Sequence, residues 1–170
     1  MRASATIRIC CLFILHGATA ADNLTHDFSR LKNLRIGEDL ADVNRRLNAD
    51  LRAPTIPTSD PTGTCFMVQT PQLEGIGLMF IKNTLARINI DAKGINTPQG
   101  VGVGTPEAAV VAAYGATVQK ERHFYDAKGK YLTIMSDGRD TGIRFEILDG
   151  IVSRFYLGTS TEIHHVEGCE

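Results

Sequence analysis

The stretch GIRFEILDGIVSRFYL, residues 142–157, decides the fold. Side chains on either side of Asp149 and Gly150 alternate between apolar and polar types, which is typical of half-buried strands. An Asp-Gly pair between two such runs predicts a tight antiparallel hairpin. We therefore expect strands at 142–148 and 151–157, joined by a two-residue turn.

Residues 34–90 and 101–157 resemble two copies of one unit, because similar side chains recur 67 positions apart. The pairs are Ile36 and Val103, Gly37 and Gly104, Ala41 and Ala108, Val43 and Val110, Leu47 and Tyr114, Ala49 and Ala116, Arg87 and Arg154, Ile88 and Phe155, and Ile90 and Leu157. Between them, the triplet Gly77, Leu78 and Phe80 matches Gly142, Ile143 and Phe145 at an offset of 65, a difference that we place in a turn. Superposition of the copies is predicted to bring Gly37 onto Gly104 and Arg87 onto Arg154.

Each copy reads as one helix followed by three strands. The helices are expected at 39–51 and 106–114, with Thr105 capping the second and Pro106 at its first position. The strands are expected at 64–70, 76–82 and 85–91, and at 130–136, 142–148 and 151–157, with a further strand at 118–125. Residues 53–62 read as a proline-rich loop, 92–100 as a linker and 158–170 as a tail without an element. The predicted fold class is α+β, with two tandem helix-strand-strand-strand repeats forming an antiparallel sheet of about six to eight strands and both helices on one face.

The first 20 residues have the order of a secretory signal peptide. Arg2 and Arg8 precede an apolar run, 9–15, and small residues end at Ala20. The run is shorter than the roughly 20 residues that a membrane-spanning helix needs. We expect cleavage before Ala21 and one domain over residues 21–170, without a membrane span. Without Arg2 and Arg8 the chain has 18 − 2 = 16 basic residues against 19 acidic ones, a charge of −3 that does not favour nucleic acid as a partner.

The cysteines support export. Cys10 and Cys11 lie in the signal peptide, so only Cys65 and Cys169 remain in the predicted mature chain. Two cysteines in an oxidising compartment are expected to pair, the alternative being two separate buried thiols. The predicted location is the periplasm or the extracellular space.

Strand alternation divides the sheet residues into two faces. The predicted helix-facing set is wholly apolar and consists of Phe66, Val68, Leu78, Phe80, Ile88, Ile90, Leu132, Ile134, Ile143, Phe145, Phe155 and Leu157. The opposite set mixes methionine, tyrosine and arginine and consists of Met67, Met79, Ile81, Arg87, Tyr131, Met135, Arg144 and Tyr156. Methionine adapts its shape while tyrosine and arginine anchor, so the second set is the candidate binding face for a protein or peptide. The alternative is that the tail, held by Cys169, covers this face.

Three other groups of residues suggest chemistry only weakly. The glycines at 100, 102 and 104 do not have the spacing of a phosphate-binding loop and read as a connector. His164 and His165, with the acidic residues and Cys169 of the tail, lack the spacing of metal ligands. His123, Asp126, Ser136 and Asp137 could form a nucleophilic set but lack a nucleophile motif. We therefore expect no cofactor, no metal and no enzymatic activity.

Three segments resemble a pattern of uncharacterised exported bacterial proteins, namely 97–115, 142–155 and the closing VEGCE at 166–170. The unit of glycine, short helix and three-stranded run also resembles the outer-membrane assembly lipoprotein BamE, although no lipid-attachment cysteine is present. Two such units in tandem are similar in plan to the secreted β-lactamase inhibitory proteins, whose loop residues have no counterpart here. These resemblances imply function through protein contact. The predicted function is thus an exported non-enzymatic protein that binds a protein or peptide, with an enzyme inhibitor next and a carbohydrate-binding module or hydrolase after it.

Overall fold

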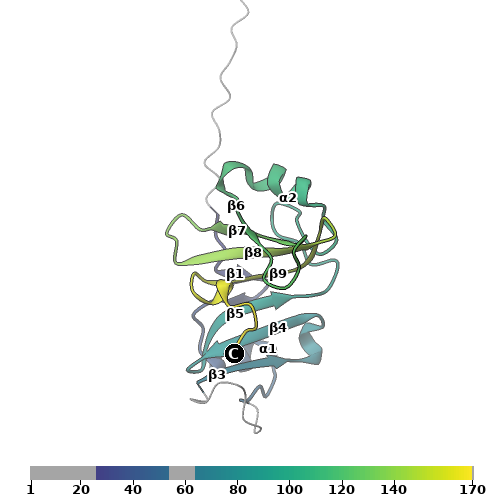
Figure 1. Cartoon of the computed structure of the whole chain (residues 1–170). Coiled ribbons are helices and arrows are strands. Elements are labelled where there is room, and N and C mark those ends of the chain that lie inside the picture. Colours follow the sequence, from purple (N-terminus) through teal and green to yellow (C-terminus); the bar gives the residue numbers. More distant parts are fainter. Residues whose placement is uncertain (1–25, 54–63, 170) are drawn as a thin grey trace, which may run out of the picture.

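A seven-stranded antiparallel sheet forms the body of the protein (Figure 1). The computed structural model describes residues 26–53 and 64–169, so the predicted signal peptide and most of the proline-rich loop lie outside the described residues. The strand order is β3-β4-β5-β9-β8-β7-β6. The bounds are β3 (Cys65–Gln69), β4 (Ile76–Ile81), β5 (Thr84–Ile90), β6 (Gln119–Arg122), β7 (Lys130–Met135), β8 (Thr141–Leu148) and β9 (Ile151–Thr159). A separate two-stranded sheet pairs β1 (Arg30–Leu31) with β2 (Leu34–Arg35).

Within the described residues, two short α-helices accompany the sheet. Helix α1 (Leu40–Leu47) begins after Asp39, whose carboxylate accepts the Ala41 N–H at 2.9 Å, and it ends where Asn48 takes a left-handed conformation. It is therefore shorter than the predicted 39–51. Helix α2 (Glu107–Tyr114) begins one residue later than the predicted 106, and the predicted cap is wrong, since Pro106 occupies the cap position. The Thr105 hydroxyl instead accepts the Gly102 N–H at 3.0 Å, which fixes the connector before the helix.

The helices and one face of the sheet enclose a single core. Val43 of α1 and Val110 and Tyr114 of α2 belong to the same buried cluster as the sheet residues. Eleven of the twelve predicted helix-facing residues lie within this cluster, and Val68, the twelfth, packs against it partly buried. The alternation of strand side chains thus predicted the core face correctly.

The hairpins β4–β5 and β8–β9 have the same construction. Their turns are Lys82-Asn83 and Asp149-Gly150, and all four residues have positive φ, as a tight hairpin turn requires. A register shift falls after Met79 in β4 and after Glu146 in β8, again 67 positions apart. The pairing keeps this offset throughout both hairpins, so the expected offset of 65 for Gly77–Phe80 is wrong.

Each helix is attached to its hairpin by three backbone hydrogen bonds at equivalent positions. In the first half these are Gly37 N–H to Leu85 O, Leu85 N–H to Glu38 O and Leu40 N–H to Asn83 O, each at 2.8 Å. In the second half they are Gly104 N–H to Val152 O at 2.8 Å, Val152 N–H to Thr105 O at 2.8 Å and Glu107 N–H to Gly150 O at 2.9 Å. Strands β5 and β9 then pair with each other and join the halves at the centre of the sheet.

The remaining elements are three 3-10 turns, η1 (Pro71–Leu73), η2 (Gly115–Thr117) and η3 (Glu162–His164). The last of these lies in the tail, where no element was predicted. The predicted strand at 118–125 is present as the shorter β6, an edge strand whose four residues are all exposed. Residues 123–129 after β6 form a loop, and residues 160–169 run from β9 back across the sheet towards β3 (Figure 1).

Candidate functional site

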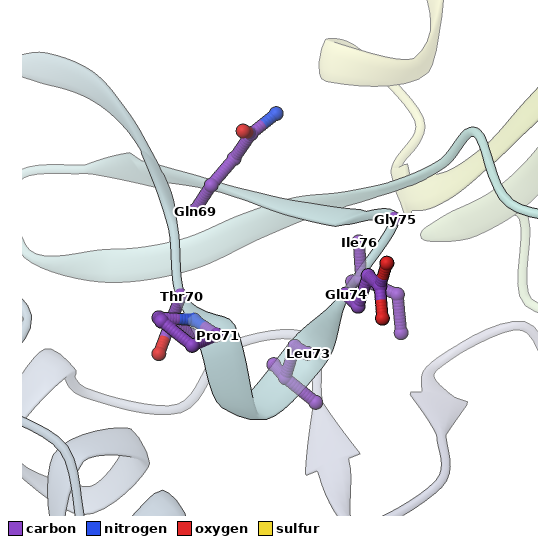
Figure 2. A pocket seen from close by; sticks show the side chains of 7 residues that line it. All are labelled: Gln69, Thr70, Pro71, Leu73, Glu74, Gly75 and Ile76. Carbon is purple, nitrogen blue, oxygen red and sulfur yellow. The ribbon is translucent and has the colours of Figure 1, made fainter.

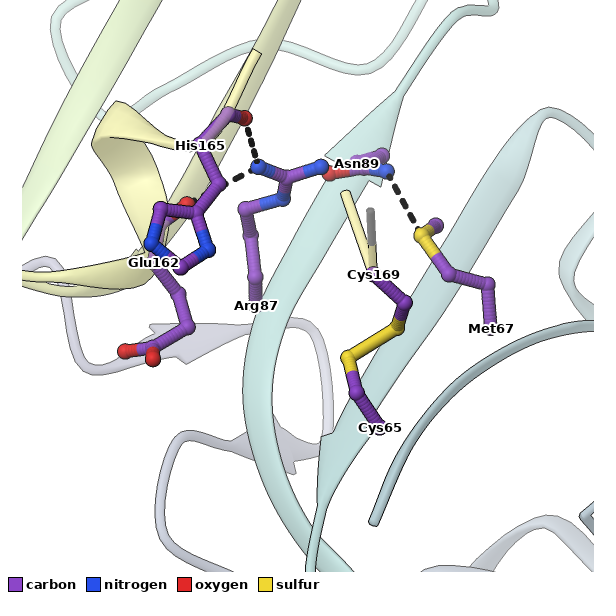
Figure 3. The surroundings of a disulfide bond; sticks show 7 residues. All are labelled: Cys65, Met67, Arg87, Asn89, Glu162, His165 and Cys169. Atoms are coloured by element: carbon purple, nitrogen blue, oxygen red, sulfur yellow. Dashed lines mark hydrogen bonds between the residues drawn. A yellow bond between two sulfur atoms is a disulfide. The ribbon is translucent and has the colours of Figure 1, made fainter. Parts of the chain in front are cut away.

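The C-terminal tail lies on the sheet face opposite the core. The Arg87 guanidinium donates Nη1–H bonds to the carbonyl oxygens of Glu162, at 2.8 Å, and His165, at 2.6 Å (Figure 3). Ile163 is fully buried and approaches the glycine position 142 on β8. The predicted disulfide between Cys65 and Cys169 is confirmed, and it fastens the end of the tail to β3.

Most of the candidate binding face is covered. Five of its eight residues are buried, namely Met79, Arg87, Tyr131, Arg144 and Tyr156, each at most 4 % exposed. Met67, Ile81 and Met135 are partly exposed. The five buried side chains cannot touch a partner in this arrangement. The tail covers Arg87, whereas His123 of the β6–β7 loop stacks on Tyr131, so the arrangement corresponds in part to the covered-face alternative.

The arginines of the covered face lie against aromatic rings. The guanidinium carbon of Arg87 is 4.7 Å from the ring centre of Tyr156, and that of Arg144 is 4.1 Å from the ring centre of Tyr131. Arg144 also donates to Thr133 Oγ1 and to Glu121 Oε2, both at 2.8 Å. Burial raises the pKa of the Tyr156 hydroxyl, and the hydrogen bond from Arg144 lowers the pKa of the Glu121 carboxyl.

The loop between β6 and β7 is held rigidly by its own polar groups. His123 is buried, and its Nδ1 accepts the N–H groups of Tyr125, at 3.1 Å, and Asp126, at 3.0 Å. The neutral ring therefore carries its hydrogen on Nε2, which lies 3.1 Å from Glu146 Oε1 without an aligned hydrogen bond. The imidazole also stacks on Tyr131 at 4.7 Å. Asp126 Oδ1 in turn accepts N–H groups from residues 128 and 129.

This loop presents two exposed aromatic side chains. Phe124 is 72 % and Tyr125 62 % exposed, and their rings meet nearly at right angles with centres 4.8 Å apart. They line a depression of about 440 Å³ together with the tail residues His164, His165, Val166 and Glu167. We call Phe124, Tyr125 and Val166 the aromatic patch. It comprises three of the four exposed large hydrophobic residues of the described chain, the fourth being Ile151.

A second depression of about 450 Å³ lies at the β3–β4 connection, residues 69–76 (Figure 2). Its side chains do not converge on a common point, since Gln69 points away from Thr70 and Leu73. It contains one carboxylate, Glu74. The arrangement suits a surface hollow better than a reaction site.

The weaker groups proposed from sequence are not assembled. Ser136 and Asp137 begin the β7–β8 connection, whereas His123 lies beside Gly129 at the opposite end of β7, so the nucleophilic set is dispersed. Within the described residues, no three histidine, cysteine or acidic side chains gather as a metal site would require. In the glycine connector before α2, the backbone N–H groups already donate hydrogen bonds within the protein, for example from Gly102 N–H to Thr105 Oγ1.

Sequence reasoning missed the aromatic patch because it considered only the sheet faces. The available signal was the adjacent pair Phe124-Tyr125 directly before the turn-forming Asp126. The tail side of the patch could not be anticipated, because residues 158–170 have no periodicity.

Comparison with models of known protein families, with curated protein sequences and with solved structures yields no match. Among residues 26–53 and 64–169, no helix has the length and apolar character needed to cross a membrane. The intramolecular disulfide agrees with residence outside the cytoplasm.

Proposed function

We propose that the protein is an exported, non-enzymatic binding protein whose ligand is a protein or peptide in the periplasm or the extracellular space. The observation that carries this proposal is the aromatic patch. Aromatic side chains dominate the energetics of protein interfaces, and exposed apolar groups gathered on one surface usually have a use. The partner would contact the tail side of the sheet at Phe124 and Tyr125, and not the buried centre of the originally predicted face.

The hydrogen bonds within the β6–β7 loop favour a role in presenting Phe124 and Tyr125 to a partner. The side chains of His123 and Asp126 accept hydrogen bonds from the backbone N–H groups of residues 125, 126, 128 and 129, so the two aromatic residues are held outward before any partner arrives. A preorganised anchor loses little conformational freedom on binding, which improves affinity. The same property supports a second candidate, a secreted enzyme inhibitor, because a rigid loop with two aromatic tips can enter an enzyme cleft.

We further propose that the two halves, residues 34–90 and 101–157, arose by duplication of one helix-strand-strand-strand unit. The equivalent hydrogen bonds of α1 and α2, the two turns with positive φ and the two register shifts support this proposal. The resemblance to BamE and to the β-lactamase inhibitory proteins supports the same proposal, since it rests on a unit of a glycine, a short helix and three antiparallel strands.

Site-specific cross-linking tests the function. A photoreactive phenylalanine analogue at Tyr125 should trap a defined partner in the native compartment, while the same analogue at Ile151 should trap none, because Ile151 is exposed on β9 outside the patch. The double change Phe124→Ser and Tyr125→Ser should abolish binding of the trapped partner. It should alter stability by no more than about 0.5 kcal/mol, since both side chains are exposed. Unchanged binding by this folded variant would refute the proposal.

A further inference from the structure

The tail does not supply hydrogen-bond partners for all the buried polar atoms of the sheet face that it covers. Six buried side-chain nitrogen or oxygen atoms of the described residues lack an aligned hydrogen bond, and five lie on this face. They are Arg87 Nε, Asn89 Oδ1 and Arg144 Nε, together with His123 Nε2, which lies 3.1 Å from Glu146 Oε1, and Tyr131 Oη, which lies at the backbone of Phe124. Buried polar groups are ordinarily paired, so a concentration of unpaired ones calls for a physical reason.

Arg87 is the most exceptional of these residues. Its side chain is only 3 % exposed, and its hydrogen-bond acceptors are two neutral carbonyl oxygens of the tail. No carboxylate of the described residues forms an ion pair with it, whereas Arg144 pairs with Glu121 at 2.8 Å. A buried guanidinium without a directly bonded carboxylate is costly. Burial lowers the pKa of Arg87, and the nearby charge of the Glu162 carboxyl opposes this shift.

The part of the tail above Arg87 is anchored at its two ends. Ile163 is buried at one end, and Cys169 is bonded to Cys65 at the other. Between these anchors, residues 164–167 are all exposed, and His165 contributes its carbonyl oxygen to Arg87. Gly168 is buried next to the Met67 sulfur and the Arg87 guanidinium. We call residues 164–169 the cover.

We propose that the cover is a disulfide-fastened lid over a carboxylate-binding site centred on Arg87, and that a small thiol opens it. The thiolate attacks one sulfur of the Cys65–Cys169 bond and forms a mixed disulfide, and a second thiol molecule resolves it. Both cysteines become thiols, and the two small thiols are oxidised to one disulfide. Arg87 then exchanges the His165 carbonyl for the carboxylate of an acidic peptide segment.

Acidic peptide is the occupant that the contacts favour. Arg87 already donates hydrogen bonds to peptide oxygen atoms, the carbonyl oxygens of Glu162 and His165, at 2.6–2.8 Å (Figure 3). A carboxylate placed at the end of the guanidinium would receive two parallel N–H bonds, one from Nη1, which now bonds the His165 carbonyl, and one from Nη2. Tyr156, whose ring lies under the guanidinium, would keep the fork in position.

The test opens the cover in two independent ways. The first variant is Cys65→Ser with Cys169→Ser. The second inserts six Gly-Ser residues after Gly168, which lengthens the cover but keeps the disulfide and its stabilising effect. Hydrogen exchange should show residues 164–168 exchanging at least tenfold faster in both variants than in the oxidised protein, while β5 and β9 stay protected. The insertion variant remains informative if the first variant fails to fold.

Binding is measured by fluorescence anisotropy with labelled octapeptides of alternating Glu and Val or alternating Lys and Val. The Glu peptide should bind the opened variants at least tenfold more tightly than the closed protein, and the Lys peptide should not bind. In the opened protein, Arg87→Gln should abolish binding and Arg87→Lys should weaken it. The matched change Arg154→Gln, at the equivalent position of β9 and half exposed, should have no effect.

Three outcomes would overturn the proposal. A cover that stays protected in both variants is a permanent part of the fold. An opened cover without peptide binding, or with equal binding of both peptides, means that the face is only a hydrated structural layer. Because Phe124 and Tyr125 lie outside the cover, the double change Phe124→Ser and Tyr125→Ser, which leaves Val166 in place, should leave Glu-peptide binding intact, so this proposal and the proposed function fail separately.

Discussion

We expect the change Gly158→Ala, which adds one methyl group where β5 and β9 pair, to lower the free energy of unfolding substantially. Gly158 lies on β9 opposite Arg87 of β5. A Cβ atom there would lie 2.5 Å from the Ala86 carbonyl oxygen and 3.0 Å from the Arg87 Cα atom. Both contacts are with backbone, which cannot rotate away as a side chain can. The strands must therefore separate, at a cost of about 2 kcal/mol, typical of overpacking.

For a protein of this size, a loss of about 2 kcal/mol lowers Tm by roughly 4–8 °C. Urea and thermal unfolding followed by far-UV circular dichroism would measure the change. The matched control is Gly138→Ala in the β7–β8 connection, where the new Cβ would meet only the Asp140 carboxylate, at 3.5 Å. The control should change stability by no more than about 0.5 kcal/mol. Equal unfolding midpoints for the two variants would show that the close approach of β5 and β9 is not what requires glycine.

Three further predictions concern stability. Replacing Cys65 and Cys169 by serine should lower the free energy of unfolding by about 3–5 kcal/mol in denaturant titrations, since the bond spans 104 positions. Gly150→Ala should cost about 1 kcal/mol in the same assay even though its Cβ meets no atom within 4 Å, because φ is +77° there. Glu107→Gln should cost up to about 1 kcal/mol at pH 7, because hydrogen bonds from Lys130 and Lys120 lower the pKa of Glu107. That stabilisation is present above the unfolded-state pKa and is lost as pH falls through the folded-state pKa, so variant and wild type should converge in urea titrations at pH 3.

The core face was predictable because strand alternation is a local property. Phe66, Leu78 and Phe155 follow the period of two, and the glycine-containing turn at 149–150 sets where each strand ends. Helix limits were less predictable. Asn48 ends α1 because it adopts a positive φ, and the Thr105 hydroxyl accepts a hydrogen bond from Gly102 in place of capping α2. Neither interaction is indicated by a pattern in the sequence.

The site was harder to anticipate than the fold because it depends on contacts between distant segments. Arg87 reaches carbonyl oxygens 75 and 78 positions away, and a backbone acceptor can belong to any residue type. The disulfide was deducible only because two cysteines remain after the predicted cleavage. Phe124 and Tyr125 lie in a loop, where alternation has no meaning and exposure must be seen in three dimensions.

The position of the disulfide also distinguishes pairing of the two halves within one chain from pairing between two chains. Cys65 belongs to the outer strand of the first half, and Cys169 follows the last strand of the second, so the bond crosses the β5–β9 joint. If two chains exchanged halves through the linker at 92–100, the same joint would form between molecules, and Cys65 of one chain would meet Cys169 of the other. If two chains have already exchanged halves, oxidation fixes them as a covalent dimer. If each chain has paired its own halves, oxidation prevents later exchange. A non-reducing gel distinguishes the two products by mass, since one is a covalent dimer and the other an internally bonded monomer.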